Sequence, residues 1–141
     1  SLIKNVQNKT HGFTEVVPLP FVHMGSPIYL RGKSMPGPTW DEIVLIHSLA
    51  RIYFVNLIDN IQASWVKLGH DGAGRLLHAG VNDLGGTLIN ENISRASGAD
   101  HGQETTQDQF IQIIESENKN PVLRNTLYTE FIETKNTLEK R

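Results

Sequence analysis

Polar side chains recur on one face of a short apolar segment at residues 60–66. The segment alternates with period two, so Asn60, Gln62 and Ser64 share one face of a predicted strand. Burying three amide and hydroxyl groups on one face is unfavourable unless they bind each other, water or a ligand. The alternative is a solvated face on an open sheet. The three residues are therefore candidates for lining a binding site.

A pair of glycines follows the next apolar segment, in the string NDLGGT. Consecutive glycines before a helix let backbone amides approach a bound carboxylate or phosphate closely. A tight turn without a ligand requires the same residues. The candidates here are Asn82, Asp83, Gly85, Gly86 and Thr87.

A carboxylate and an imidazole belong to the first extended segment. Glu15 lies within it and His23 follows it. Ligands of parallel α/β folds bind beyond the carboxyl ends of the strands, so both side chains could reach the same site. Structural roles are the alternative for both residues.

Several kinds of chemistry are excluded by composition and spacing. The 141 residues include no cysteine and carry a formal net charge of -2. This rules out cysteine-held metal clusters within the chain and gives no sign of nucleic-acid binding. The six histidines show no metal-ligand spacing, and neither HExxH nor GxSxG occurs. We therefore predict no metal site and assign no catalytic residue, and the lack of a long apolar run predicts no membrane span.

Short strands alternate with helices along the chain. Residues 13–21 should be extended, with pairing lost near Pro18 and Pro20, and residues 23–38 should form a loop. A capping box at Thr39 and Glu42 predicts a helix start, with an apolar stripe facing a sheet. The polar side of this helix should hold Asp41, His47, Ser48 and Arg51.

The remaining elements follow the same alternation. We expect strands at 60–66 and 81–86, helices at 72–79, 88–96 and 106–116, and a polar tail or frayed helix from Pro121 onward. Gly80 should end the helix before it. A β-α-β-α order predicts parallel strands with right-handed helical connections.

Six strings together resemble a known family. They are PLPFVH (18–23), PGPTWDE (36–42), NIQASWVKLG (60–69), NDLGGTL (82–88), ENISRASGADHGQ (91–103) and RNTLY (124–128). They resemble the C-terminal part of the radical S-adenosylmethionine (SAM) enzymes of deazaflavin and menaquinone biosynthesis, above all the tyrosine-using half of FO synthases. The resemblance runs from about residue 13 to residue 128.

The resemblance implies an α/β fold that is one arc of a (β/α)8 TIM-type barrel. The chain would supply about three βα units plus an extra helix and a tail, since a complete barrel needs about 250 residues. Residues 1–12 would end the preceding barrel helix or linker, 13–118 would form the C-terminal βα units, and 119–141 would be a C-terminal tail. By itself such an arc should be inactive and poorly stable, because it has open strand edges.

The resemblance also implies a reaction for the intact cytoplasmic enzyme. A [4Fe-4S] cluster, held by cysteines outside this chain, and SAM would start radical chemistry on L-tyrosine. The 4-hydroxybenzyl group would join 5-amino-6-(D-ribitylamino)uracil on the way to coenzyme F420. The missing N-terminal barrel half is an expected partner, and the other FO synthase half is a candidate partner.

The candidate site residues would then line the barrel interior. We expect them to position substrates or SAM, with no part in proton or radical transfer; the interior set is Asn60, Gln62, Ser64, Asn82 and Asp83, with Glu15 and His23. Two alternatives stay open. One is a menaquinone-pathway enzyme that acts on a futalosine scaffold, and the other is a stand-alone α/β module that binds a small anion at Gly85-Gly86.

Overall fold

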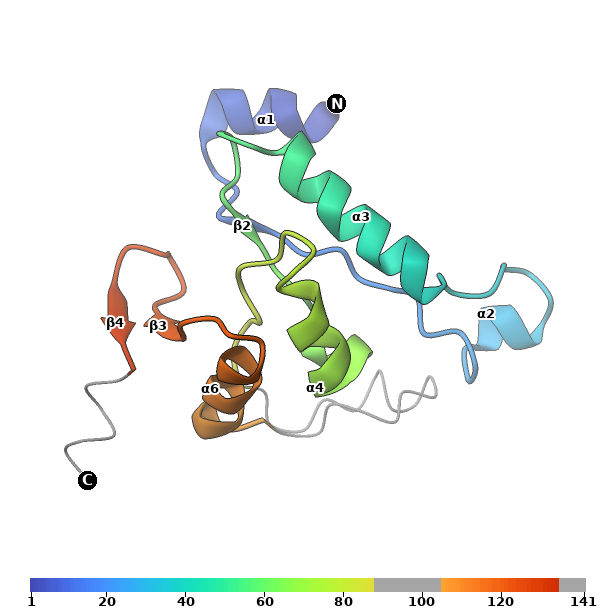
Figure 1. The fold of residues 1–141 in the computed structure, drawn as a ribbon. Coiled ribbons are helices and arrows are strands. Elements are labelled where there is room, and N and C mark those ends of the chain that lie inside the picture. The colour runs from blue at the N-terminus through green and yellow to red at the C-terminus, as the bar shows by residue number, and fades with distance from the viewer. Residues whose placement is uncertain (88–104, 135–141) are drawn as a thin grey trace.

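The computed structural model describes residues 1–87 and 105–134, which form a mixed α/β structure (Figure 1). The helix expected at 88–96 lies outside these ranges. The described elements, in chain order, are α1 (Leu2–Thr10), β1 (Glu15–Val16), α2 (Pro27–Leu30), α3 (Trp40–Tyr53), β2 (Asn60–Ile61), α4 (Trp65–Leu76), α6 (Gln107–Ser116), β3 (Val122–Arg124) and β4 (Phe131–Glu133).

Three chain segments pair in parallel, as the alternation of strands and helices predicts. Strand β1 pairs with β2 in the register Glu15–Asn60 and Val16–Ile61. An isolated parallel bridge joins Gln62 to Asp83 and adds a third segment beside β2. Each connection between neighbouring segments contains helix, α2 and α3 in the first and α4 in the second.

One side of β2 packs into the main core. Ile61 and Ala63 are fully buried, which confirms the period-two prediction for this side as far as Ala63. They pack in one cluster with Ile43 and Ala50 of α3. The opposite side of the strand, which carries the polar residues, is only partly buried.

Helix α3 begins where its capping box predicts. The Glu42 amide donates to Thr39 Oγ1 at 3.3 Å, and the Thr39 amide donates to the Glu42 carboxylate at 2.7 Å. These bonds satisfy two amides that the first turn would otherwise leave unpaired. The bond from the Thr39 backbone is also the main cause that lowers the pKa of Glu42.

The predicted polar side of α3 does not face solvent, apart from Asp41, which is exposed. His47 is completely buried, Ser48 donates to the Ala79 carbonyl, and Arg51 points at the strands. Apolar residues cover a wide arc of this helix, so its hydrophobic pattern alone does not select the buried side. Four large apolar side chains of α3 are instead between 48% and 70% exposed: Leu45, Ile46, Leu49 and Ile52.

The strand predicted at 60–66 is shorter, and the helix predicted at 72–79 starts earlier. Ser64 is the N-cap of α4, so the chain turns into helix directly after the bridge at Gln62. Gly69, with φ of 70°, kinks α4, a conformation open to glycine because it has no Cβ. The prediction that Gly80 ends this helix is wrong: α4 ends at Leu76 with Leu77 as its C-cap, and Gly80, with φ of 93°, lies in the turn that follows.

The other helix and strand predictions are partly confirmed. Pairing of the first extended segment ends before Pro18, as expected, but only Glu15–Val16 is paired. The short helix α2 interrupts the predicted loop at 23–38, with Pro27 in its first turn. Helix α6 begins at a Thr106–Gln109 capping box and matches the prediction for 106–116.

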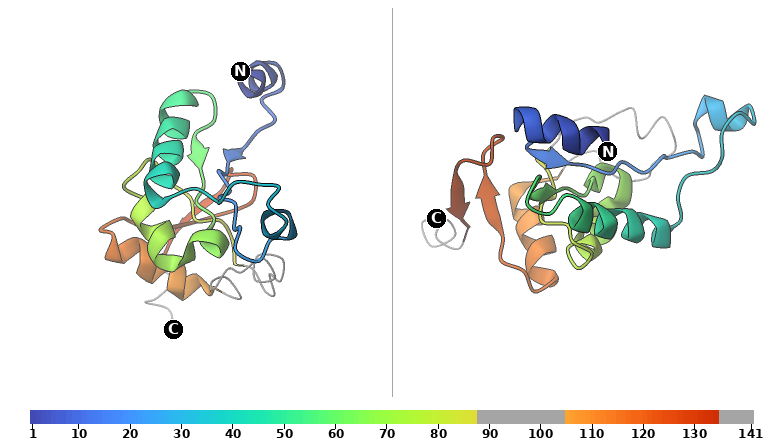
Figure 2. Two further views of the ribbon diagram at one scale, coloured as in Figure 1. Left: turned by 90° about the vertical axis from the view of Figure 1, so that its right-hand side faces the viewer. Right: turned by 90° about the horizontal axis from the view of Figure 1, so that it is seen from above.

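The prediction of a tail or frayed helix after Pro121 is wrong, because β3 and β4 form an antiparallel hairpin. Val122, Leu123 and Arg124 pair with Glu133, Ile132 and Phe131. The turn is held by the amide of Asn125, which donates to the Glu130 carbonyl at 3.2 Å, and by side-chain bonds between Asn125 and Thr129. The hairpin lies on the side of β2 away from α3 in Figure 1 and in the view from above in Figure 2.

No helix within residues 1–87 and 105–134 has the length and apolar character needed to cross a membrane. The division of the chain at residues 12 and 118 stays a prediction.

Candidate functional site

Four polar side chains start from one face of the three parallel segments. Laterally paired residues of parallel strands share a face, which groups Glu15 with Asn60 and Gln62 with Asp83. Asn60 and Gln62 are two residues apart on β2, so all four belong to the same face. This is the face opposite the buried Ile61 and Ala63.

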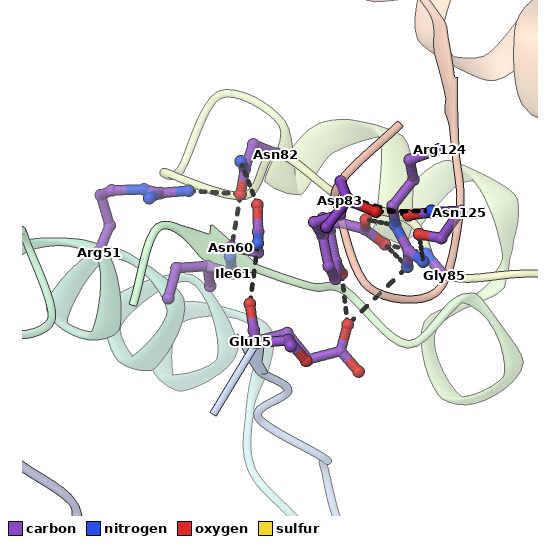
Figure 3. Close-up of polar contacts among 12 residues, drawn as sticks. Glu15, Arg51, Asn60, Ile61, Asn82, Asp83, Gly85, Arg124 and Asn125 are labelled. Atoms are coloured by element: carbon purple, nitrogen blue, oxygen red, sulfur yellow. Dashed lines mark hydrogen bonds and ion pairs between the residues drawn. The ribbon is translucent and has the colours of Figure 1, made fainter. Parts of the chain in front are cut away.

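The Asp83 carboxylate is held by an arginine of the hairpin (Figure 3). Arg124 Nε donates to Oδ2 at 2.5 Å, and Nη2 donates to Oδ1 at 3.0 Å. The Gly85 amide also donates to Oδ1, at 2.5 Å. The Asp83 and Arg124 side chains are only 7% and 20% exposed. Asp83 therefore joins the hairpin to the glycine turn.

The Glu15 carboxylate meets the same hairpin. The Tyr128 hydroxyl donates a short hydrogen bond to Glu15 Oε2, and Arg124 Nη2 lies 3.8 Å from this oxygen. The Arg124 guanidinium also lies over the Tyr128 ring, 4.0 Å from its centre. The carboxylates of Asp83 and Glu15 thus share the Arg124 guanidinium, and Tyr128 contacts both Glu15 and Arg124.

The surroundings fix the protonation states of the hairpin residues. Hydrogen bonding to Asp83 raises the pKa of Arg124 above its ordinary value. Burial raises the pKa of Tyr128, and its bond to Glu15 adds to the shift. At neutral pH the phenol is therefore a neutral hydrogen-bond donor and the guanidinium is charged.

A second polar network joins the strands to α3. Arg51 donates to the Gly80 carbonyl at 2.7 Å, the Asp59 carbonyl at 2.6 Å and Asn82 Oδ1 at 2.5 Å. Asn82 Oδ1 also accepts from the Ile61 amide, and Asn60 donates to the Thr14 carbonyl. Asn60 and Asn82 therefore join neighbouring backbone segments.

The glycine turn packs directly on the polar face. Gly85 has φ of 79°, and a Cβ at this position would lie 2.7 Å from Gln62 Nε2. The Gly86 carbonyl accepts from the Trp65 indole at 3.2 Å. The amide of Gly85 is already bonded to Asp83, so it is not directed at an external anion.

A cavity of about 840 Å³ lies between the glycine turn, α6 and the hairpin. Both Arg124 and Tyr128 line it. Six of the candidate site residues do so as well: Asn60, Asn82, Asp83, Gly85, Gly86 and Thr87.

The other four candidates relate to this cavity differently. Gln62 packs beneath Gly85, and Glu15 is joined to the lining through Tyr128. Ser64 is outside the lining and occupies the N-cap position of α4 without a capping bond from its side chain. His23 is also outside it: its Nδ1 accepts from the Gly37 amide at 2.8 Å, and its ring packs on Tyr29. The structure therefore does not bring His23 to the other candidates.

Sequence reasoning missed Arg124, Tyr128 and Arg51 as site residues. The string RNTLY, which contributes to the family resemblance, contains the first two. This string could have identified both residues as candidates, but a polar tail or frayed helix after Pro121 does not predict that they lie near the strands. The hydrophobic pattern of α3 predicts Arg51 on the polar side of the helix, away from the sheet.

The chain lacks the cysteine ligands that iron–sulfur clusters usually have. The sequence has no cysteine, and the part of the chain that the structure describes contains no group of three or more His, Cys, Asp or Glu residues placed to hold a metal ion. Cysteine thiolates, which hold most iron–sulfur clusters, are thus absent from this chain.

Parallel strands with a polar face beside a cavity define an α/β protein with its candidate site at the strand ends. The chain belongs to the CofH/MqnC C-terminal region family, whose sequence model matches residues 10–137. This agrees with the resemblance seen in the six strings.

Relatives of known name cover nearly the whole chain. It is 52% identical over 126 residues to a 5-amino-6-(D-ribitylamino)uracil–L-tyrosine 4-hydroxyphenyl transferase of Methanopyrus kandleri, covering 89% of this chain and 34% of that protein. A transferase of the same name from Methanothermobacter thermautotrophicus is 46% identical, covering 92% of this chain and 35% of that protein. An FO synthase of Mycobacterium leprae is 46% identical, covering 90% of this chain and 15% of that protein. The chain thus spans about a third of the transferases it matches.

Proposed function

We propose that the protein containing this chain transfers the 4-hydroxybenzyl group of L-tyrosine to 5-amino-6-(D-ribitylamino)uracil, in the formation of FO and coenzyme F420. The observation that carries this proposal is the identity of 46% to 52% to two transferases named for these substrates. The family model matches residues 10–137, a range that includes the strand ends and the hairpin.

In this proposal the chain is an arc of a TIM-type barrel. Three parallel segments joined through helices support it, since this is the repeating unit of such barrels. Within the described ranges, β1 pairs only with β2. Its other edge is where a preceding barrel strand would pair.

SAM and the [4Fe-4S] cluster belong to the radical SAM class and not to a site formed by this chain alone. Because the chain has no cysteine, the cluster ligands would come from the rest of the protein. The role proposed for this chain is to bind and orient the organic substrates or SAM.

The polar face and the glycine turn are proposed to perform this binding. Asn60, Asn82 and Asp83 line the cavity, and Gln62 supports the turn that lines it. The side chains of Asn60, Asn82 and Asp83 are tied to backbone groups or to an ion pair, so these three side chains are oriented before a substrate arrives. A fixed polar wall orients a substrate at low entropic cost.

The complete protein provides the test. It should form the transfer product from L-tyrosine and the ribitylaminouracil, and Gln62→Leu should lower turnover while the iron content stays unchanged. Gln112→Leu, on an exposed position of α6, is the matched control and should leave turnover unchanged. Wild-type protein that carries its cluster but forms no transfer product would reject the proposal.

The family description also contains MqnC, which favours a menaquinone-pathway enzyme as the second candidate. Turnover of a futalosine-type substrate, without reaction of tyrosine and the ribitylaminouracil, would select this alternative. The cytoplasmic location stays a prediction that fractionation of the host cells would test.

A further inference from the structure

The β3–β4 hairpin reaches the polar face from distant parts of the sequence. Tyr128 is 113 positions from its partner Glu15, and Arg124 is 41 positions from Asp83. The hairpin buries little apolar surface, because four of its large side chains are between 43% and 62% exposed: Val122, Leu123, Phe131 and Ile132. The strongest contacts between the hairpin and the parallel segments are therefore the Arg124–Asp83 ion pair and the hydrogen bond from Tyr128 to Glu15.

The ion pair fixes geometry more effectively than it stabilises the fold. Desolvation cancels much of the attraction between two poorly exposed charges, and apolar residues of similar size often stabilise a protein as well. A guanidinium, however, binds a carboxylate through two parallel bonds and so fixes its orientation. Arg124 makes such a paired contact with Asp83 at the wall of the cavity.

The orientation of Asp83 is passed on to the glycine turn. Oδ1 accepts from both Arg124 Nη2 and the Gly85 amide. A shift of the carboxylate would therefore also shift the turn that lines the cavity. On the other side of Arg124, Tyr128 holds Glu15 and presents its ring to the guanidinium.

We propose that Arg124 and Tyr128 are positioning residues of the candidate site. They hold the Asp83 and Glu15 carboxylates and the glycine turn in the arrangement that binds substrate, and so set the KM of at least one of the two substrates. This inference rests on the proposed function.

The test uses the complete protein and measures KM and kcat for both substrates. Arg124→Met should raise the KM of at least one substrate by about tenfold, since it removes both arginine hydrogen bonds to Asp83. Arg124→Lys keeps the charge but loses the paired geometry, and should restore less than half of the lost kcat/KM. Tyr128→Phe removes one hydroxyl and should raise the same KM by about threefold.

Arg75 offers a matched control. It also faces a carboxylate, Asp71 at 3.8 Å, and lies 4.4 Å from the centre of the Trp40 ring, but it is outside the cavity lining. Arg75→Met should leave both KM values unchanged. If it raised them as much as Arg124→Met does, the effect would be general to such contacts, and the positioning role would be rejected.

Thermal unfolding of each variant separates positioning from folding. If Arg124→Met fails to fold, Tyr128→Phe decides, because it keeps the ring and its packing. An active wild-type protein whose KM values are unchanged in Tyr128→Phe, or unchanged in folded Arg124→Met, would overturn the inference while leaving the proposed function intact. A cluster-loaded wild-type protein without transfer activity would overturn both.

Discussion

Arg124 and Asp83 form a two-point contact, with Nε 2.5 Å from Oδ2 and Nη2 3.0 Å from Oδ1. The contact joins the C-terminal hairpin to the third parallel segment, and both side chains are largely withdrawn from solvent. Removing one partner therefore leaves the other charge poorly solvated and unpaired. The hairpin and the glycine turn depend on this contact for their relative placement.

The loss of one partner should cost more than the loss of both charges. Arg124→Met leaves the Asp83 carboxylate unpaired and should destabilise the folded state by about 3 kcal/mol. Adding Asp83→Asn removes that charge but keeps an acceptor for the Gly85 amide, so the double variant should be more stable than Arg124→Met alone. Thermal and urea unfolding of the complete protein would measure this, and strictly additive effects would contradict it.

The two glycines of the turn should respond differently to a methyl group. Gly85→Ala places a Cβ 2.7 Å from Gln62 Nε2 at a φ of 79°, whereas nothing lies within 4 Å of a Cβ at Gly86. We expect Gly85→Ala to cost about 1–2 kcal/mol of stability from the backbone alone, and to lower kcat/KM. Gly86→Ala is the control for stability, and the same unfolding measurements should show little change. Equal losses of stability from both substitutions would contradict the placement of the turn.

The buried His47 should make stability depend on pH. Its Nδ1 lies 2.7 Å from the Ile43 carbonyl, its Nε2 has no partner among the described residues, and burial lowers its pKa below the ordinary value of 6.5. Below pH 6.5 the unfolded chain binds a proton at this residue more readily than the folded chain does. Its contribution to stability is thus fully present above pH 6.5 and is lost as the pH falls towards the lowered folded-state pKa.

Replacing His47 should remove this part of the pH dependence. We expect the melting temperature of His47→Leu in the complete protein to fall less than that of wild type between pH 7.5 and 5.5, as about one protonation event is removed. His11→Asn, at an exposed helix end, is the control and should follow the wild-type curve. If the melting temperatures of wild type and His47→Leu fell equally with pH, the pKa of His47 would not be lowered in the folded protein, and the prediction would be wrong.

The exposed apolar side of α3 should make the isolated chain aggregate. Leu45, Ile46, Leu49 and Ile52 are all about half exposed or more, and contiguous apolar surface of this kind promotes association. Light scattering of the isolated 141 residues should detect aggregates, and Leu45→Lys with Ile52→Lys should reduce them. A monodisperse wild-type chain with a cooperative thermal transition would contradict this expectation and the barrel-arc proposal.

Local signals in the sequence predict much of this fold. The Thr39–Glu42 capping box, the end of pairing before Pro18 and the buried side of Ile61 and Ala63 all follow from rules that act within a few residues. The parallel pairing follows from the order of elements. These features need no knowledge of distant contacts.

The features that sequence reasoning missed depend on long-range contacts. Arg51 faces inward because three of its nitrogens bond to groups 8 to 31 positions away, which an ambiguous helical pattern does not reveal. The hairpin lacks a glycine or proline in its turn, and Asn125 and Thr129 close it through side-chain bonds. Without the hairpin, the partners of Glu15 and Asp83 could not be foreseen.

A chimeric enzyme tests the central claim most directly. In it, this chain replaces the 126 matching residues of the Methanopyrus kandleri transferase, to which it is 52% identical. The chimera should bind its iron–sulfur cluster and form the transfer product from L-tyrosine and 5-amino-6-(D-ribitylamino)uracil, and Gln62→Leu in the same chimera should lower turnover. A folded, cluster-loaded chimera that forms no transfer product would contradict the claim that this chain supplies the substrate-binding wall of such an enzyme.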